Sequence, residues 1–521
     1  MAMVGLRWGG HRAGVLALAT AAVVAGIGFS APPSLLAVAL GRGAFLSLYI
    51  LYIVWPALLL YHVVDEAGGI RDIGISVAGL TRNHIVQLLI LGVAFTTFLQ
   101  GVAGFGVPVA VVAPLLLGMG FPAQQATAAA LVGHAWAVSL GDMASSFQAL
   151  RAVTDLPGHE LGLWTAGFLS LCGLLTAFAV AHIHGGFSAI RRWPGPTLIL
   201  GLATAGTQLL LAYFDYWILA TFGAGLVGLV VGLGLTKLRR YQGPSRPAEL
   251  PPKPEAERVR PVPLPPSDAR MGFHTAFAAY YILVGVVLAA TLIPPVHQSL
   301  SAAVFTLTFP ETRTGLGWVQ KASTATFTPL AHPGTLLLCT AVLAWGFYRA
   351  QARWPSGRAP QLLRALLREA IPTSLGILAM VMTAMIMTAS GMTFVLARGV
   401  VTVTGPAYPL AAPLIGLLGC FITGSNTSSN ILFGPLQMEA ARLLAAPPVV
   451  LAAAQSAGGA LGSMVSPAKV LVACATVGLS RREGAVLARV LPYCLLFTLL
   501  VGGLAWLLIA RGPGLSPAVL P

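Results

Sequence analysis

The stretch "FITGSNTSSNILFG", Phe421–Gly434, places two glycines, two asparagines and five hydroxyl side chains between two apolar runs. In hydrocarbon, every unsatisfied polar group costs several kcal/mol, so irregular polar backbone survives only inside protein or beside a water-filled cavity. The stretch is therefore either a surface loop or the lining of a binding site. The rest of the chain decides between the two.

The composition excludes an ordinary soluble domain. The 521 residues are 57% hydrophobic and 9% charged, which indicates an all-α polytopic membrane protein. The formal charge of +15 fits Lys and Arg in cytoplasmic loops. A basic stripe interleaved with aromatics is absent, so no nucleic acid partner is expected. The five cysteines are scattered through apolar runs without metal spacing, and we expect them to be packing residues and no cofactor to be bound.

Charge in the loops predicts the topology. The N-terminus lacks an Ala-x-Ala cleavage site and is interpreted as a first transmembrane helix that starts inside. The Pro-rich linker 237–270 and the arginine-rich segment after residue 348 are expected to be cytoplasmic, whereas loop 294–332, with only Arg313 and Lys321, suits the outside. The predicted location is the bacterial cytoplasmic membrane. Nine apolar runs are long enough to span: 13–30, 43–64, 159–182, 196–212, 216–236, 272–293, 333–352, 371–389 and 486–510.

Two regions have a different pattern. Residues 84–120 and 407–443 each contain two short apolar arms around a glycine-rich or polar turn. Each arm is too short to cross about 30 Å of hydrocarbon as a helix, so a re-entrant hairpin fits better. The runs 122–150 and 447–475 are long enough to cross but are interrupted by "LGDMASS" and "LGSMVSP", which predicts broken helices. The sum is about eleven spans and two hairpins.

The two regions also align with each other. Gly101 and Gly424 lie 323 residues apart, and Gly141 and Gly462 lie 321 apart. The span after the first copy starts outside and its counterpart starts inside, so the copies are inverted. Inverted repeats with interrupted helices indicate a transporter site near the bilayer midplane. The predicted organisation is an N-terminal helix and loop (1–42), repeat 1 (43–190), connecting helices (191–365), repeat 2 (366–510) and a tail (511–521).

The hairpin tips are the predicted substrate site. The unpaired N–H groups that begin each second arm carry partial positive charge and favour an anion. Glycines permit the turn and close approach of a ligand, although tight helix packing is the alternative role for them. The expected substrate-binding residues are Gln100, Gly101, Gly104, Gly106, Ser425, Asn426, Thr427, Ser428, Ser429 and Lys469.

The helix breaks carry the candidate charges. The repeat offset pairs His134 with Gln455, Asp142 with Ser463, and Gln148 with Lys469. A charge inside a membrane costs about 2.5–3.5 kcal/mol on insertion scales, so function is the first hypothesis for Asp142 and Lys469. Lys469 would face an anionic substrate, Asp142 would carry the coupling proton or ion, and His134 would relay protons. The alternatives are that Asp142 and Lys469 pair across the break and that His134 is hydrogen-bonded at a helix interface.

An enzyme is not expected. The "LGD" at Asp142 is faintly similar to an intramembrane aspartyl protease, but the second aspartate, Asp215, follows it in the wrong order. The chain has no HExxH, GxSxG or phosphate-loop motif.

Three motifs resemble the L-lactate permease family of bacteria: "FLQGVAGFGVPVA" (98–110), "TGSNTSSNILFGPLQ" (423–437) and "SAGGALGSMVSPAKVLVACATVGL" (456–479). The resemblance runs from about Trp55 to Leu150 and from about Pro372 to the C-terminus. It implies proton-coupled uptake of 2-hydroxymonocarboxylates such as lactate and glycolate across the cytoplasmic membrane. We expect such transport to proceed by alternating access, with the hairpin-bearing unit moving against the remaining spans. The family usually has Glu at the position of Gln100, Asp at Asn426 and Lys at Ser463. Charge is therefore expected to have moved to Asp142, His134 and Lys469.

The second tip is also similar to the Ser-Asn-Thr triplets of sodium-coupled carboxylate transporters, through Ser425, Asn426 and Thr427. Sodium coupling is thus the mechanistic alternative to proton coupling, because neutral oxygens suit a hard cation. From a different class, a non-transporting receptor or scaffold would explain the spans but not two matched polar interruptions. The partners expected are the small organic anion, a coupling proton or sodium, and the lipid bilayer. The oligomeric state stays open, a homodimer included.

Overall fold

The computed structural model describes residues 10–78, 81, 83–104, 106–241, 271–354, 357–479 and 482–511. Most of the predicted Pro-rich linker, residues 242–270, and the tail from residue 512 lie outside the described residues. The all-α polytopic class is confirmed: within the described ranges, nine helices are long and apolar enough to span a membrane, or ten if a bent pair counts as one. Such a chain folds as helices because a helix satisfies its own backbone groups in hydrocarbon.

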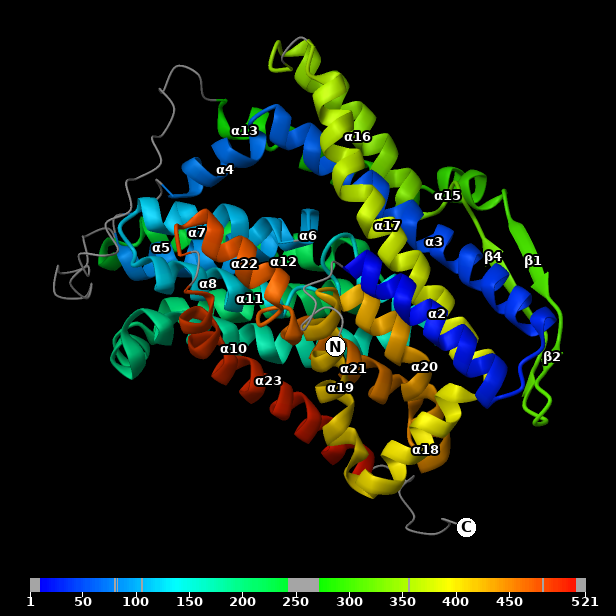
Figure 1. The fold of residues 1–521 in the computed structure, drawn as a ribbon. Coiled ribbons are helices and arrows are strands. Elements are labelled where there is room, and N and C mark those ends of the chain that lie inside the picture. Colours follow the sequence, from blue (N-terminus) through cyan, green and yellow to red (C-terminus); the bar gives the residue numbers. More distant parts are fainter. Residues whose placement is uncertain are drawn as a thin grey trace.

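One layer contains the first long helix of each predicted repeat, together with N-terminal and connecting helices, and lies along one side of the molecule (Figure 1). Its longest helices, α3 and α17, pack on each other, and α2 packs on α17 while α16 packs on α3. The helices of this layer and those next to it are α2 (Gly10–Gly28), α3 (Pro33–Glu66), α4 (Gly69–Ala78), α13 (Phe273–Ala276), α14 (Ala278–Leu292), α15 (Pro294–Ser301), α16 (Pro333–Ala350) and α17 (Ala359–Ser390).

A second set of helices covers the opposite side. Here α10 packs on α11, and α11 packs on α12. Helix α23, the last helix described, runs beside α10 (Figure 1). The set consists of α10 (Gly158–Arg192), α11 (Pro194–Tyr213), α12 (Trp217–Lys237), η2 (Arg239–Tyr241) and α23 (Glu483–Arg511). Helix α18 (Met392–Thr404), which η6 (Gly405–Ala407) follows, instead packs on α17.

Between these layers lie two helical units, here called unit 1 (residues 84–154) and unit 2 (residues 408–476). Unit 1 contains α5 (His84–Leu89), η1 (Ile90–Phe95), α6 (Thr96–Val102), α7 (Val107–Gly118), α8 (Ala123–Ala135) and α9 (Ser145–Thr154). Unit 2 contains α19 (Tyr408–Thr423), α20 (Asn426–Leu444), α21 (Pro448–Gly462) and α22 (Pro467–Thr476). The helix ends fall where the sequence predicts two hairpins and two broken helices. That each hairpin enters and leaves the membrane on one side stays a prediction.

Loop 294–332 contains strands that the sequence analysis does not anticipate. Strand β1 (Phe305–Phe309) pairs antiparallel with β4 (Ser323–Phe327), and β2 (Thr312–Arg313) pairs with β3 (Val319–Gln320). The alternation of Thr with Phe, Leu and Ala suits a pleated ribbon with two different faces. Aromatic rings attach the ribbon to α3, since Phe309 lies 6.4 Å from Phe45 and Phe327 lies 6.0 Å from Tyr49 between ring centroids.

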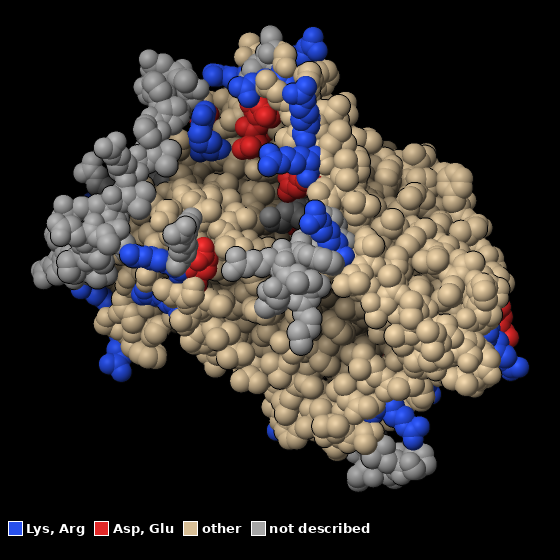
Figure 2. Space-filling view, in the orientation of Figure 1, with Lys and Arg blue, Asp and Glu red and all other residues tan. Residues whose placement is uncertain are grey.

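The surface is consistent with a lipid environment. Figure 2 shows a broad region without charged residues, while Lys, Arg, Asp and Glu gather in the upper part and around a central hollow. Large hydrophobic side chains such as Ile27, Val230 and Leu496 are exposed on the outer helices. In a membrane these side chains contact lipid tails, so their exposure costs nothing.

Candidate functional site

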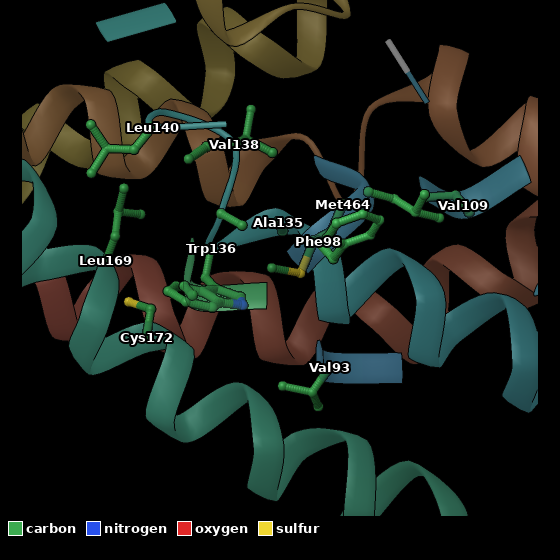
Figure 3. Packing of buried hydrophobic residues seen from close by; sticks show 14 of the residues in the cluster. Val93, Phe98, Val109, Ala135, Trp136, Val138, Leu140, Leu169, Cys172 and Met464 are labelled. Atoms are coloured by element: carbon green, nitrogen blue, oxygen red, sulfur yellow. The ribbon is translucent and has the colours of Figure 1, made fainter. Parts of the chain in front are cut away.

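The first break, residues 136–144, separates α8 from α9 and starts at a buried tryptophan. Figure 3 shows the Trp136 ring lying against Leu169 and Cys172 of α10. Gly173 of the same helix makes the space, because a Cβ there would lie 2.5 Å from the Trp136 ring. This fit anchors the end of α8 and fixes where the irregular backbone begins.

The backbone of the first break is strained. Asp142, Met143 and Ala144 have φ of 50°, 53° and 61°, and a left-handed non-glycine residue costs roughly 1–2 kcal/mol. Two hydrogen bonds to carbonyls at the end of α6 stabilise this conformation: the Asp142 amide donates to the Gln100 carbonyl at 2.6 Å, and the Met143 amide donates to the Gly101 carbonyl at 3.3 Å. Strain of this kind concentrates at functional sites, where the surroundings over-determine the conformation.

The first tip, residues 103–106, joins α6 to α7. Gly106 begins α7 with φ 93°, and a Cβ there would meet no atom within 4 Å. Gly104 lies against the carboxylate of Asp142, since a Cβ at Gly104 would come within 3.4 Å of its Cγ. Gly101 has a different role: a Cβ there would lie 2.5 Å from the backbone of Phe222 in α12. Gly101 therefore has the helix-packing role that was the alternative to ligand binding. Gly104 borders the first break, and Gly106 forms the turn.

The second tip, residues 424–425, joins α19 to α20. Gly424 ends α19 with φ 76°, and the Ser425 hydroxyl caps α20 by accepting from the Ser428 amide at 3.3 Å. Two side chains at the start of α20 reach unit 1: the Asn426 amide donates to Ser139 Oγ of the first break at 2.9 Å, and the Thr427 hydroxyl lies 2.8 Å from Ser146 Oγ at the start of α9. The second tip is thus attached to unit 1.

Further hydrogen bonds extend this contact between the units. The side-chain amide of Asn430 donates to the Ser146 carbonyl and to Ser456 Oγ, both at 3.0 Å. Ser139 Oγ in turn lies 2.9 Å from Ser456 Oγ. All of these groups are buried, where a satisfied polar network fixes one arrangement.

The predicted proton relay and the predicted substrate lysine meet in the core. His134 Nδ1 lies 3.2 Å from the Ala130 carbonyl, so it donates. In the neutral ring Nε2 is then an acceptor. Lys469 Nζ lies 3.4 Å from Nε2 and Ser463 Oγ lies 3.3 Å from it, so both act as donors. Among the residues that the structure describes, no ion pair joins Lys469 to Asp142. The alternative in which these two charges pair across the break is therefore not observed.

Several buried oxygens near the breaks have no hydrogen-bond donor. Ser145 donates to Asp142 Oδ2 at 3.0 Å, but Asp142 Oδ1, Gln100 Oε1 and Asn426 Oδ1 have no hydrogen-bond partner among the residues that the structure describes. Buried acceptors of this kind are costly unless a ligand, an ion or water satisfies them. In the described residues, no group of three or more His, Cys, Asp or Glu is placed to hold a metal ion.

The remaining predicted residues, Ser428 and Ser429, form hydrogen bonds within their own unit. The Ser429 hydroxyl donates to the Gly416 carbonyl at 2.8 Å, and the Ser428 amide is used by the cap. Conversely, the sequence analysis did not include Ser139, Ser146 and Ser456 in the site, although all three lie in the inter-unit network. For Ser139 and Ser146, the signal available in the sequence was their position within a few residues of the "LGD" motif.

Comparison with known proteins identifies the family of this chain. The family model described as L-lactate permease matches residues 1–511. The chain belongs to the L-lactate permease family. It is therefore a multi-pass membrane protein of a permease family and not an enzyme, as the sequence predicts.

Relatives match along nearly the whole chain. The glycolate permease GlcA of Escherichia coli K12 is 28% identical over 535 residues, covering 96% of this chain and 92% of that protein. The L-lactate permease of Bacillus subtilis 168 is 28% identical over 527 residues, covering 95% and 91%. A crystal structure of the YdaH transporter of Alcanivorax borkumensis aligns over 92% of this chain and 89% of its own, at 16% identity and TM-score 0.48.

Proposed function

We propose that this L-lactate permease family member is a secondary active transporter of small organic monocarboxylates such as lactate and glycolate, coupled to protons, in the bacterial cytoplasmic membrane. The observation that carries the proposal is Lys469. Its ammonium is buried, faces a neutral imidazole and has no carboxylate partner in the described residues. A buried charge is stable only when it is paired, and the carboxylate of a substrate would supply the missing partner.

The arrangement of the two units supports alternating access. The second arm of each predicted hairpin packs on the second half of the other unit's broken helix: α20 packs on α9, and α7 packs on α22. A two-fold relation between inverted repeats produces such an exchange of partners. Substrate would bind between the first break, the second tip and Lys469. A movement of the two units against the remaining spans would expose that site to each side of the membrane in turn.

In this mechanism Asp142 carries the coupling proton. In the described part of the chain its Oδ1 has no hydrogen-bond partner and its other oxygen accepts from Ser145, so Oδ1 is the oxygen that would hold the proton. His134 holds the Lys469 ammonium through Nε2 until the substrate carboxylate takes over that contact. Asp142 would then take over the role of the two carboxylates that the family usually has at the positions of Gln100 and Asn426.

A specific observation favours sodium as the second candidate for the coupling ion. The unpartnered buried atoms Asp142 Oδ1, Gln100 Oε1 and Asn426 Oδ1 are all oxygen acceptors. Hard cations prefer oxygen ligands from carboxylates and amides. The Ser425–Asn426–Thr427 tip has the residue types that such a site needs.

The test is uptake of labelled L-lactate into proteoliposomes, with an inward proton gradient or an inward sodium gradient imposed separately. Protein-free liposomes and a proton ionophore are the controls. Accumulation driven by protons alone supports the proposed coupling, and accumulation driven by sodium alone supports the second candidate. L-Lactate binding to purified protein without uptake under either gradient would favour a receptor and contradict the transporter.

A further inference from the structure

Helix α17 contains an acidic residue that takes no part in the candidate site. Glu369 lies in the second and third turns after Ala359, the first residue of α17, at a depth of about 15 Å along the helix. The helix Ala359–Ser390 is one of the candidate membrane spans. An ionisable side chain inside a span is costly, and its default explanation is a role in function.

On one side Glu369 faces the end of α3. His62 Nε2 lies 3.3 Å from Glu369 Oε2, and the two side chains are 12% and 33% exposed. One turn further along α3, Glu66 pairs with Arg358 at 3.3 Å, directly before α17. The arginine-rich segment predicts that this end of the molecule is cytoplasmic, and Figure 2 shows acidic and basic residues around a central hollow. Glu369 therefore lies, partly exposed, beside a charged region on the predicted cytoplasmic side.

On its other side α17 reaches the two units. Helix α17 packs on α20, and α3 packs on α9. Ala370, the neighbour of Glu369 in the chain, lies in one buried hydrophobic cluster with Ala149 of α9 and Ile431 of α20. Across this contact Glu369 acts electrostatically on Asp142. Glu369 is thus placed between the proposed proton carrier and the charged ends of α3 and α17.

The titratable groups next to Glu369 are few. Besides His62 and Asp142, Glu369 acts electrostatically on Tyr61 of α3. Among the described residues, the other charged groups of the helices that pack on α17 form no ion pair with Glu369; they are Arg12 of α2, Arg42, Asp65 and Glu66 of α3, Arg398 of α18, and Glu439 and Arg442 of α20.

We infer that Glu369 takes the coupling proton from Asp142 and releases it to the cytoplasm, with His62 as the residue that positions its carboxylate. The inference rests on the proposed function, because it assigns a path to the coupling proton. In this step the Asp142 carboxyl loses a proton through intervening water, and an oxygen of Glu369 gains it. Glu369 then gives the proton to cytoplasmic water, so both groups are carboxylates again before the next cycle. Carboxylates relay protons in this way in pumps and transporters.

The test compares Glu369→Gln with Glu66→Gln in right-side-out vesicles, whose interior is the cytoplasmic side. Glu66 is the matched control, because it is a carboxylate of the same charged region that pairs with Arg358 instead. Glutamine cannot relay a proton, so Glu369→Gln should lower proton-driven accumulation of L-lactate at least about tenfold. Exchange of external for internal L-lactate should stay within about twofold. Glu66→Gln should match the wild type in both modes within about twofold.

A measurement of sidedness separates proton release from a structural role. Raising the internal pH at fixed external pH should speed initial uptake by the wild type, because it favours release of the proton to the inside. Uptake by Glu369→Gln should not respond, and Glu369→Asp should recover the response. His62→Gln should weaken the response and lower accumulation about threefold, with exchange unchanged.

The inference alone is overturned if Glu369→Gln accumulates L-lactate as the wild type does, or if its exchange falls as far as its accumulation. If Glu369→Gln does not fold, His62→Gln on α3 decides: a weaker response to internal pH supports the inference, and a wild-type response overturns it. If the wild type itself shows no proton-driven accumulation, the proposed coupling fails and the inference fails with it.

Discussion

Units 1 and 2 share an order of helices but divide the chemistry. Unit 1 turns at glycines without a side-chain cap and then breaks over residues 136–144, with three residues in the left-handed region. Unit 2 turns at a tip capped by Ser425 and breaks over residues 463–466, all with negative φ. Unit 1 supplies the carboxylate of Asp142 and the imidazole of His134. Unit 2 supplies the ammonium of Lys469 and the side-chain amide of Asn426. Neither unit alone contains the candidate site.

The largest expected effect on transport comes from removing the charge of Lys469 in unit 2, compared with a change at the corresponding position of unit 1. Lys469→Gln removes the buried ammonium that faces His134, whereas Gln148→Ala changes the corresponding position of unit 1. Truncating a buried charge contact costs about 2–5 kcal/mol, so Lys469→Gln should lower kcat/KM for L-lactate by about 100-fold. Gln148→Ala should change it by less than about threefold. Initial uptake rates in proteoliposomes measure both, and equal losses would show that the units do not differ in this respect.

The next effect separates the two kinds of glycine in unit 1. Gly101→Ala would place a methyl group against the backbone of Phe222, and overpacking of this kind costs about 1–3 kcal/mol. Gly106→Ala meets no atom and strains only φ, at about 1 kcal/mol. Thermal unfolding in detergent should therefore show the larger drop in Tm for Gly101→Ala. The reverse order would contradict the packing role of Gly101.

A smaller effect tests the capped tip. Ser425→Ala removes the acceptor for the Ser428 amide, and loss of an N-cap costs about 1 kcal/mol. We expect a Tm lower by a few degrees, with Ser425→Asp retaining the wild-type Tm because Asp is also a good cap. A Tm unchanged in Ser425→Ala would mean that α20 does not depend on this cap.

The smallest effect tests the strain in the first break. Ala144 and Ala460 are both fully buried alanines, but Ala144 has φ 61° and Ala460 lies inside α21. Ala460→Gly should destabilise by about 1 kcal/mol, as glycine does in a helix interior. Ala144→Gly relieves left-handed strain that roughly offsets the entropy cost of glycine, so Tm should stay the same or rise slightly. Equal losses would remove the evidence for strain.

Much of the fold follows from the sequence. Glycine, proline and polar residues interrupt apolar runs at the first tip, the second tip and both breaks, and the helices end there because such residues do not continue a helix in hydrocarbon. The β ribbon was missed, because its strands are short and lie in a loop where length gives no signal. Its Thr–Phe alternation predicts a strand only when a partner surface, here α3, is known.

The candidate site was less predictable. The repeat offset relates positions within the sequence, such as His134 and Gln455, but it does not say which residues touch. The structure instead joins His134 to Lys469 and Asn426 to Ser139, residues that do not correspond by offset. Contacts between units depend on how the helices pack, and single-sequence patterns carry no information about that. The different roles of Gly101 and Gly106 could not be predicted for the same reason, because they depend on which helices pack against each glycine.

The most direct test of the account is the effect of Asp142→Asn on two modes of L-lactate transport, with Ser463→Asn as the matched change in unit 2. If Asp142 carries the coupling proton, accumulation driven by a proton gradient should fall at least about tenfold, while exchange of external for internal L-lactate should stay within about twofold. Ser463→Asn should leave the ratio of the two modes unchanged. Proton-driven accumulation that persists in Asp142→Asn would contradict the assignment of coupling to unit 1.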